Sequence, residues 1–171
     1  MKKVLLFLAV LGLPFFLAAC DSAEQGDYTP GVYYGYSSGH QNSYAVVTVD
    51  ENGMIVSVLI DSVYLKTEEG GPVSWVSREN EVEGIATTKR ALDGGCAYHM
   101  HRGKDVVDCE VEGELMWHQQ VDAIAAAVVE AQELPNWTLE DNYFGDDGVA
   151  GVSITVNTYI EAVRNALNQA Q

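Results

Sequence analysis

In the first half of the chain, hydrophobic and polar positions alternate in short runs, which predicts β-strands. Residues 32–37 are rich in aromatic side chains and are expected to form the first strand. Two β-branched runs follow at residues 44–50 and 54–63, and Asn52-Gly53 stands between them. Because Asn-Gly is the strongest short-range hairpin signal, the sequence predicts an antiparallel hairpin over residues 44–63.

In the second half, apolar residues recur every three or four positions, which predicts helices. Residues 114–132 show this spacing, and Pro135 lies just beyond their end. A second such stretch occupies residues 156–169. The apolar positions of the two stretches are Trp117, Val121, Ile124, Val128, Val156, Ile160, Val163 and Leu167. Strands followed by helices are typical of an α+β fold, so we expect an antiparallel sheet packed against two C-terminal helices.

Between residues 64 and 113 the pattern is weaker. Residues 73–76 are a candidate short strand, and residues 87–92 are a candidate helical turn that ends at Asp93-Gly94-Gly95. No Gly-x-Gly-x-x-Gly follows the first strand, which argues against a doubly wound nucleotide-binding fold.

The chain begins with the pattern of an exported protein. Lys2 and Lys3 precede an apolar run over residues 4–17, and Leu17-Ala18-Ala19-Cys20 closes it. This pattern indicates a secretory signal with a small-residue cleavage site rather than a membrane span. Its last four residues match the bacterial lipobox, so we expect cleavage before Cys20 and lipidation of its thiol.

The expected mature protein consists of one anchored domain. Residues 1–19 form the signal peptide, residues 20–27 a lipidated linker, and residues 28–171 a domain long enough for one core. Acyl chains on Cys20 make a stable anchor. The domain is therefore expected on the outer face of the bacterial cytoplasmic membrane, on the periplasmic side or at the cell surface.

The chain is strongly acidic, since 25 Asp and Glu residues against 9 Lys and Arg residues give a net charge of −16. Loss of residues 1–19 removes Lys2 and Lys3 and makes the net charge −18. Such a surface argues against binding of nucleic acid and against docking on anionic lipid headgroups. It is compatible with solubility, with divalent cations or with a basic protein partner.

Two cysteines remain besides Cys20. Cys96 and Cys109 are an even number in an oxidising compartment, so a disulfide between them is expected. Two free thiols and a metal site are the alternatives, because His99 and His101 lie in the same segment. The Cys-x-x-Cys half-site that is usual for zinc is missing from the sequence.

A glycine-rich segment precedes the last predicted helix. Residues 147–155 (Asp-Gly-Val-Ala-Gly-Val-Ser-Ile-Thr) bring two glycines and two hydroxyl side chains to the start of that helix. Backbone N–H groups at a helix N-terminus lack partners within the helix, and the helix dipole favours negative charge there. The segment is therefore a candidate phosphate site, although Ser and Thr also cap helices for structural reasons.

Most of the chain resembles the FMN-binding domain family, in its lipid-anchored extracytoplasmic form. That family includes the periplasmic flavin-carrying subunits of the sodium-pumping NADH:quinone reductase and of related electron-transfer complexes. The order and spacing of several segments carry the resemblance. They are residues 28–35 (Tyr-Thr-Pro-Gly-Val-Tyr-Tyr-Gly), Asn52-Gly53, Thr87-Thr88-Lys89, residues 117–122 (Trp-His-Gln-Gln-Val-Asp) and residues 147–155.

In the family, the closing motif is Asp-x-x-Ser/Thr-Gly-Ala-Thr/Ser, followed by one residue and a further hydroxyl. A flavin transferase can join the last hydroxyl of the core motif to FMN through a phosphodiester. By this resemblance Asp147 matches the Asp and Gly151 matches the Gly. Ser153 matches the acceptor, and Thr155 is the trailing hydroxyl.

Two positions of the motif differ in this chain. Ala150 stands where the family has Ser or Thr, and Val152 stands where it has Ala. A β-branched side chain restricts a backbone that must approach a phosphate closely. Covalent FMN at Ser153, noncovalent FMN and the absence of flavin therefore remain as alternatives.

The resemblance implies an electron carrier rather than an enzyme with its own substrate. FMN would perform the electron-transfer chemistry, while the protein binds and orients it. Thr87 and Thr88 are expected to add hydroxyl donors, and Lys89 is expected to offset the phosphate charge. The implied partners are the membrane through Cys20, redox proteins and a flavin transferase. The competing interpretations are a flavin-free surface interaction or assembly lipoprotein of the same fold, and a metal-binding lipoprotein.

Overall fold

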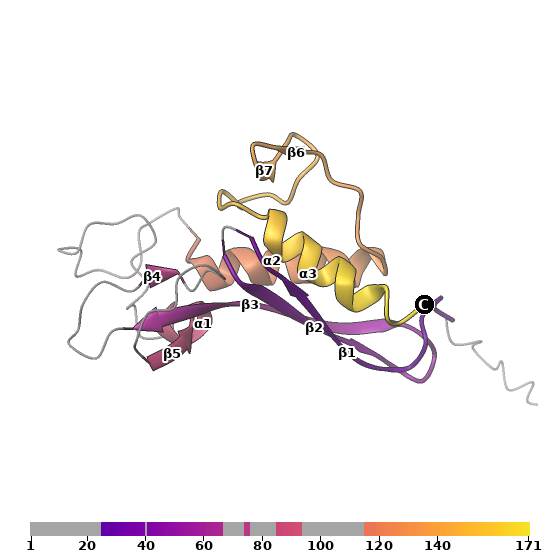
Figure 1. Cartoon of the computed structure of the whole chain (residues 1–171). Coiled ribbons are helices and arrows are strands. Elements are labelled where there is room, and N and C mark those ends of the chain that lie inside the picture. The colour runs from indigo at the N-terminus through magenta and orange to yellow at the C-terminus, as the bar shows by residue number, and fades with distance from the viewer. Residues whose placement is uncertain (1–24, 40, 67–73, 76–84, 94–114) are drawn as a thin grey trace, which may run out of the picture.

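The computed structural model describes residues 25–39, 41–66, 74–75, 85–93 and 115–171 (Figure 1). Its elements are β1 (Gly31–Ser37), β2 (Ser43–Val49), β3 (Ile55–Lys66), β4 (Ser74–Trp75), β5 (Ile85–Thr88), α1 (Lys89–Asp93), α2 (Trp117–Ala131), β6 (Leu139–Glu140), β7 (Tyr143–Phe144) and α3 (Asn157–Leu167). An antiparallel sheet is followed by two long helices that pack on it, so the predicted α+β fold is confirmed.

The sheet is built around β3. β1 pairs with β2, and β2 pairs with the first part of β3, where Ser43 lies opposite Ser62. The last part of β3 pairs with both β4 and β5, which lie on its two sides at Tyr64. The order β1-β2-β3-β4 places β4 on the side of β3 away from β2, so β5 lies on the side of β2. The chain that leaves β5 therefore comes close to the start of β2.

The predicted hairpin over residues 44–63 is confirmed, and Gly53 at its tip has the positive φ of 80° that favours glycine. The start of the described chain is tied to this tip, because the Gly26 N–H donates to the Asn52 carbonyl oxygen at 2.9 Å. The folded part therefore begins before residue 28, where the sequence predicted the domain to start.

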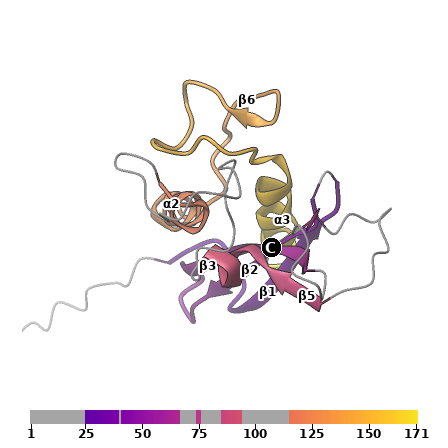
Figure 2. The same ribbon diagram turned by 90° about the vertical axis from the view of Figure 1, so that its left-hand side faces the viewer.

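Both long helices cover the same face of the sheet, with α3 over β1 and β2 and with α2 over β3 (Figure 2). α2 and α3 lie within the predicted ranges 114–132 and 156–169. The end of α2 is held to the sheet by Gln132, whose side chain accepts the Ile55 N–H at 2.8 Å and donates to the Ile55 carbonyl oxygen at 2.9 Å.

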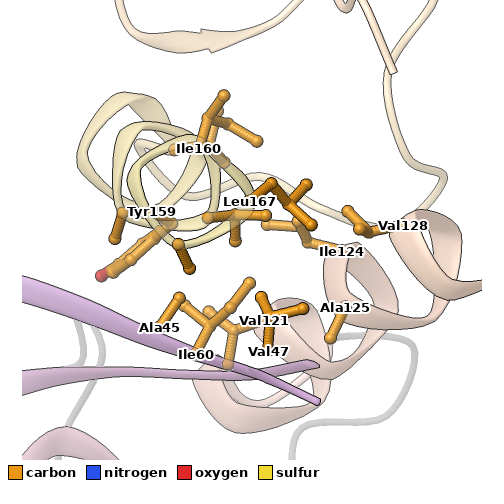
Figure 3. Packing of buried hydrophobic residues seen from close by; sticks show 14 of the residues in the cluster. Ala45, Val47, Ile60, Val121, Ile124, Ala125, Val128, Tyr159, Ile160 and Leu167 are labelled. Atoms are coloured by element: carbon orange, nitrogen blue, oxygen red, sulfur yellow. The ribbon is translucent and has the colours of Figure 1, made fainter. Parts of the chain in front are cut away.

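The core lies between the sheet and the two helices (Figure 3). Ala45, Val47 and Ile60 come from the sheet, and the helices contribute the apolar positions that the spacing predicted. Those helix positions are Trp117, Val121, Ile124, Val128, Val156, Ile160, Val163 and Leu167. Each is buried, so the helical periodicity identified the faces that pack on the sheet.

The prediction of a helical turn over residues 87–92 is wrong at its start. Thr87 and Thr88 belong to β5, and the chain is helical only from Lys89. The reason lies in the tertiary structure: β5 pairs with the end of β3, where Thr88 lies opposite Val63. The candidate strand at residues 73–76 contains β4.

Several predicted features fall outside the described residues. These are the signal peptide, Cys20, Cys96, Cys109, His99 and His101. In the described part of the chain, no helix combines the length and apolar character that crossing a membrane requires. The same residues contain no group of three or more His, Cys, Asp and Glu side chains suited to a metal ion.

Candidate cofactor site

The chain that leads into α3 alternates between the core and the surface. Val152, Ile154 and Val156 pack in or against the core. The side chains between them are Ser153, which is exposed, and Thr155, which is half-buried. Within the described residues, neither hydroxyl has a protein hydrogen-bond partner. The hydroxyl of Ser153, the predicted acceptor, is therefore accessible at the surface.

Gln120, in the first turns of α2, fixes the backbone at Ser153. Its Oε1 accepts the Ser153 N–H at 2.7 Å, and its Nε2 donates to the Leu115 carbonyl oxygen at 2.9 Å. The Gln120 side chain is only 1% exposed, so water does not compete for these bonds. Ser153 is thus held at a defined position beside α2.

The turn before Ser153 requires glycine. Gly151 has a φ of 80°, and a β-carbon there would lie 2.9 Å from Cδ1 of Leu115. Val152, one of the two departures from the family motif, is half-buried against the core. Its branched side chain therefore packs inward while Ser153 is exposed.

Asp147 stabilises its own loop. Both of its carboxylate oxygens accept the Thr138 N–H, each at 3.0 Å. This bond joins the segment before Ser153 to the connection that follows α2. The position of an Asp in the motif therefore has a structural explanation that needs no ligand.

Lys89 is buried rather than on the surface, with a side chain that is 2% exposed. Its Nζ donates to Gln41 Oε1 at 3.0 Å and to the Tyr159 hydroxyl at 2.9 Å. The ammonium group also lies 5.1 Å from the ring centre of Trp117. Lys89 would therefore influence a surface phosphate through its electric field and not by direct contact.

A network of hydrogen bonds extends from Lys89 through Tyr159. The Tyr159 hydroxyl accepts the Trp117 Nε1–H at 3.1 Å and donates to Gln41 Oε1 at 3.0 Å. Gln41 Nε2 in turn donates to Thr158 Oγ1 at 3.0 Å. The network joins α1, α2, α3 and the chain just before β2. A buried network whose members satisfy one another holds these elements in one arrangement.

The network lies where both long helices begin. Trp117 is the first residue of α2, and Tyr159 is the third residue of α3. Helix N-termini carry a partial positive charge. The Lys89 side chain, bonded to Tyr159, lies at the same corner in a chain of net charge −16.

The residues next to Lys89 in the sequence form hydrogen bonds that stabilise the start of α1 and its contacts with β3 and α2. Thr88 Oγ1 accepts the Ala91 N–H at 3.1 Å and so caps the start of α1. The Arg90 N–H donates to Asp61 Oδ1 at 3.1 Å, and the Arg90 guanidinium bonds Asp122 Oδ1 at 2.8 Å. Thr87 is half-buried in β5.

Residues 115–120, which lead into α2 and form its first turn, contact several of the predicted residues. Gly151 lies against Leu115, Ser153 is bonded to Gln120, and Lys89 lies over the Trp117 ring. The remaining predicted residues support their own turns or strands, namely Asp147, Thr87 and Thr88. The predicted set is thus divided between residues that lie beside the start of α2 and residues with local structural roles.

Three important residues escaped the sequence analysis as site residues, namely Gln41, Gln120 and Tyr159. One signal was present for Gln120, because it is a polar side chain within the apolar stripe of α2. Nothing local distinguishes Gln41 or Tyr159. These two residues are hydrogen-bonded to each other although they are 118 residues apart in the sequence, so only the packing of α3 on the sheet brings them together.

The bond from Gln120 to Ser153 leads to a prediction. Gln120→Met keeps the side-chain volume but leaves the Ser153 N–H and the Leu115 carbonyl oxygen without this partner. We expect a loss of about 1–3 kcal/mol in the free energy of unfolding. We also expect faster hydrogen exchange at the Ser153 amide, measured by NMR relative to the core amide of Val128.

Gln120→Glu is the matched control, because it keeps an acceptor for the Ser153 N–H. Its Ser153 amide should stay protected relative to Val128, even if the buried carboxylate lowers stability. Equal relative protection of Ser153 in the wild type and both variants would show that Gln120 does not hold the loop.

No family model matches the chain, and no curated protein matches it. Among solved structures, it is similar to a solution NMR structure of a structural genomics target from Clostridium thermocellum. The sequence identity is 21% and the TM-score is 0.44, and the match covers 82% of this chain and 90% of that chain. A similarity at this level carries no functional conclusion.

Proposed function

We propose that this chain is a lipid-anchored extracytoplasmic FMN-binding protein that acts in electron transfer. The FMN phosphate is held at residues 147–155, with Ser153 as the attachment or binding residue. The anchor is Cys20, the covalent form is made by a flavin transferase, and electrons pass to and from redox partner proteins.

The observation that carries this proposal is that the Ser153 hydroxyl is accessible while the Ser153 backbone is held in place. Its side chain is exposed and its hydroxyl has no partner among the described residues, while its backbone N–H is held by buried Gln120. A hydroxyl that is accessible but fixed in position suits phosphodiester formation, because little ordering is needed before reaction. Thr155 is the second hydroxyl beside it.

Local charge also supports a phosphate at this corner. A chain of net charge −16 repels anions at long range, so a phosphate requires a local positive field. α3 begins at Asn157, two residues after Thr155. The buried Lys89 ammonium is bonded to Tyr159, which lies in the first turn of α3. Both favour negative charge just outside the helix.

Bound FMN supplies the one- and two-electron chemistry. The residues of this chain bind and orient it. Ser153 and Thr155 provide hydroxyls, Gly151 allows the backbone to turn, and Gln120 keeps the loop in place.

Ser153→Ala tests covalent attachment. The full chain is coexpressed with a flavin transferase in an exporting bacterial host, and the denatured band is examined for flavin fluorescence in the gel. We expect a fluorescent wild-type band and complete loss in Ser153→Ala. Ser57→Ala, which removes an exposed hydroxyl from β3, is the control and should keep full fluorescence.

Persistent fluorescence in Ser153→Ala would assign the attachment to another residue. A wild-type band without fluorescence, combined with flavin absorption of the native protein, would indicate noncovalent FMN. A colourless protein that does not bind added FMN would contradict the flavin proposal. It would favour the second candidate, a flavin-free interaction or assembly lipoprotein, which the exposed apolar side chains of Val32, Tyr34, Tyr36 and Leu59 on the sheet also suit.

A further inference from the structure

The side of the sheet that faces away from α2 and α3 presents an apolar surface rich in tyrosine (Figure 2). Alternation along the paired strands places one set of side chains on this side, and we call these residues the outer face. They are Val32, Tyr34 and Tyr36 of β1, Tyr44 and Val46 of β2, and Leu59 of β3. The exposed ones are Val32, Tyr34, Tyr36 and Leu59. Exposed apolar side chains that lie together are typical of an interaction surface.

The outer face consists of uncharged residues, although the chain has 25 acidic residues. Asp61 lies opposite Tyr44 in the sheet but is only 4% exposed. The Tyr44 hydroxyl donates to Asp61 Oδ2 at 3.1 Å. Burial and the neighbouring Asp61 carboxylate raise the pKa of Tyr44 to about 12, so its hydroxyl stays neutral near neutral pH.

Two other surfaces of the described chain carry carboxylates. On the helix side, α2 and the connection to α3 bear the exposed acidic residues Asp122, Glu130, Glu133, Glu140, Asp141 and Asp146. At the hairpin tip, Glu51 is exposed, and Asp50 Oδ1 accepts the Met54 N–H at 2.8 Å. This hydrogen bond lowers the pKa of Asp50, so the tip is negatively charged near neutral pH. The outer face, in contrast, can meet an apolar layer without burying a carboxylate.

The edge of the sheet at β1 is occupied by side chains from the end of the chain. Asn165 Nδ2 of α3 donates to the Tyr36 carbonyl oxygen at 2.9 Å, and Gln169 Nε2 donates to the Tyr34 carbonyl oxygen at 2.7 Å. Edge groups that already have partners disfavour pairing with a strand of another protein. The outer face is therefore better suited than this edge to make a contact.

The start of the described chain limits the distance between this sheet and a membrane anchor at Cys20. The Gly26 N–H donates to the Asn52 carbonyl oxygen at 2.9 Å, so residue 26 lies level with the end of the sheet. Gly26 follows Cys20 by six residues, and an extended chain spans at most about 3.5 Å per residue, so the tether reaches about 21 Å. Side chains extend about 5 Å from a sheet, because packed sheets lie about 10 Å apart. The outer face can therefore reach a bilayer that holds acyl chains on Cys20.

A tether of this length leaves the domain few orientations on the membrane. If it stood on the hairpin tip, Asp50 and Glu51 would approach the lipid phosphates. If it lay on the helix side, the carboxylates of α2 would do so. Repulsion between negative charges disfavours both arrangements. The outer face instead offers tyrosine rings, which favour the membrane–water interface because each has an apolar body and a polar end.

We propose that the outer face rests on the bilayer in which Cys20 is anchored, with the rings of Tyr34 and Tyr36 in the interfacial layer. This inference rests on the lipid anchor of the proposed function and not on FMN. The tether keeps the outer face near the lipid at an effective concentration on the order of millimolar, so a weak contact is sufficient. The sheet then lies flat on the membrane, and α2, α3 and the Ser153 loop beside α2 lie on the side that faces the aqueous phase.

Hydroxyl-radical footprinting tests the contact on the full chain, which is lipidated in an exporting bacterial host, purified and inserted into phosphatidylcholine vesicles. Oxidation of Tyr34 (55% exposed) is compared with that of Tyr143 (44%), and oxidation of Leu59 (42%) with that of Leu139 (37%). The reference is residues 21–171 without an anchor, in buffer. We expect both oxidation ratios to be at least about threefold lower on vesicles, because lipid contact removes water from Tyr34 and Leu59. Unchanged ratios would overturn the proposal.

A matched pair of substitutions locates the contact. Tyr34→Glu brings a carboxylate to the bilayer, so oxidation of Leu59 on vesicles should return to the level of the unanchored chain. In Tyr143→Glu, the control, Leu59 should stay protected. Circular dichroism should show that both variants are folded, and equal effects of the two would overturn the assignment. Protection of Leu59 in host membranes but not in pure phosphatidylcholine vesicles would identify a protein as the occupant and overturn the proposal.

The intact mass of the purified chain separates this proposal from the function on which it rests. Acyl chains on Cys20 combined with unchanged oxidation ratios would overturn the membrane contact alone. A chain without acyl groups would overturn the anchor and the contact with it. Flavin content is read separately from the absorption spectrum, because the contact requires no FMN.

Discussion

Gly35→Ala is expected to lower the free energy of unfolding by about 3 kcal/mol, which is the upper end of the cost of overpacking. α3 lies directly on β1 at this residue. A β-carbon on Gly35 would lie 1.9 Å from the Ala162 carbonyl oxygen and 2.5 Å from the Ala166 nitrogen. Both are backbone atoms, so no side-chain rotation relieves the clash, and the whole helix must move.

Movement of α3 has a second consequence, because Asn165 on that helix and Gln169 just after it bond the carbonyl oxygens of Tyr36 and Tyr34. These bonds lengthen or break when the helix is pushed from the sheet. Thermal unfolding should show a decrease in Tm of roughly 6–12 °C, at about 2–4 °C per kcal/mol for a chain of this size.

Gly145→Ala is the matched control. The nearest atom to its added β-carbon would be the Thr138 carbonyl oxygen at 3.4 Å, an ordinary contact distance. Its expected effect on the free energy of unfolding is below about 1 kcal/mol. If Gly35→Ala were no more destabilising than Gly145→Ala, the close approach of α3 to β1 would be wrong.

Tyr159→Phe is expected to cost about 3 kcal/mol although it removes a single oxygen atom. That oxygen accepts hydrogen bonds from Lys89 Nζ and from Trp117 Nε1, and it donates to Gln41 Oε1. All four residues are buried. Loss of a partner costs a buried polar group about 1–3 kcal/mol, and more when the group is charged.

The control is Tyr33→Phe, whose hydroxyl also makes a hydrogen bond, to the Thr29 carbonyl oxygen at 2.8 Å, but at an exposed position. Water replaces that bond, so denaturant unfolding should show a loss below about 1 kcal/mol. Similar losses in the two variants would mean that the buried network does not stabilise the fold.

Local sequence patterns were sufficient for most of the secondary structure. Asn52-Gly53 between two β-branched runs predicted the hairpin, since Gly53 needs its positive φ whatever surrounds it. The spacing of apolar residues identified the buried faces of α2 and α3. Such signals depend on residues that are close to each other in the sequence, so they can be recognised without knowledge of the fold.

The predicted site was only partly accessible from the sequence. The motif singled out Ser153, and the structure shows that its side chain is exposed. Lys89 was expected to offset the phosphate charge, and the structure shows that it is 2% exposed and bonded to Gln41 and Tyr159. The sequence around a lysine that follows a strand is the same whether its side chain is solvated or buried. The tertiary structure around Lys89 therefore decides its exposure.

The sequence by itself determined the order of strands and helices, the hairpin and the faces that are buried, because these follow from backbone preferences and hydrophobic periodicity over short distances. Only the tertiary structure decided that Lys89 and Tyr159, which are 70 residues apart, share a buried network, that Gln120 holds Ser153, and that both long helices of the described chain pack on the same face of the sheet. Hydrogen bonds between distant segments form only after the helices pack on the sheet, and nothing in either segment alone specifies the other.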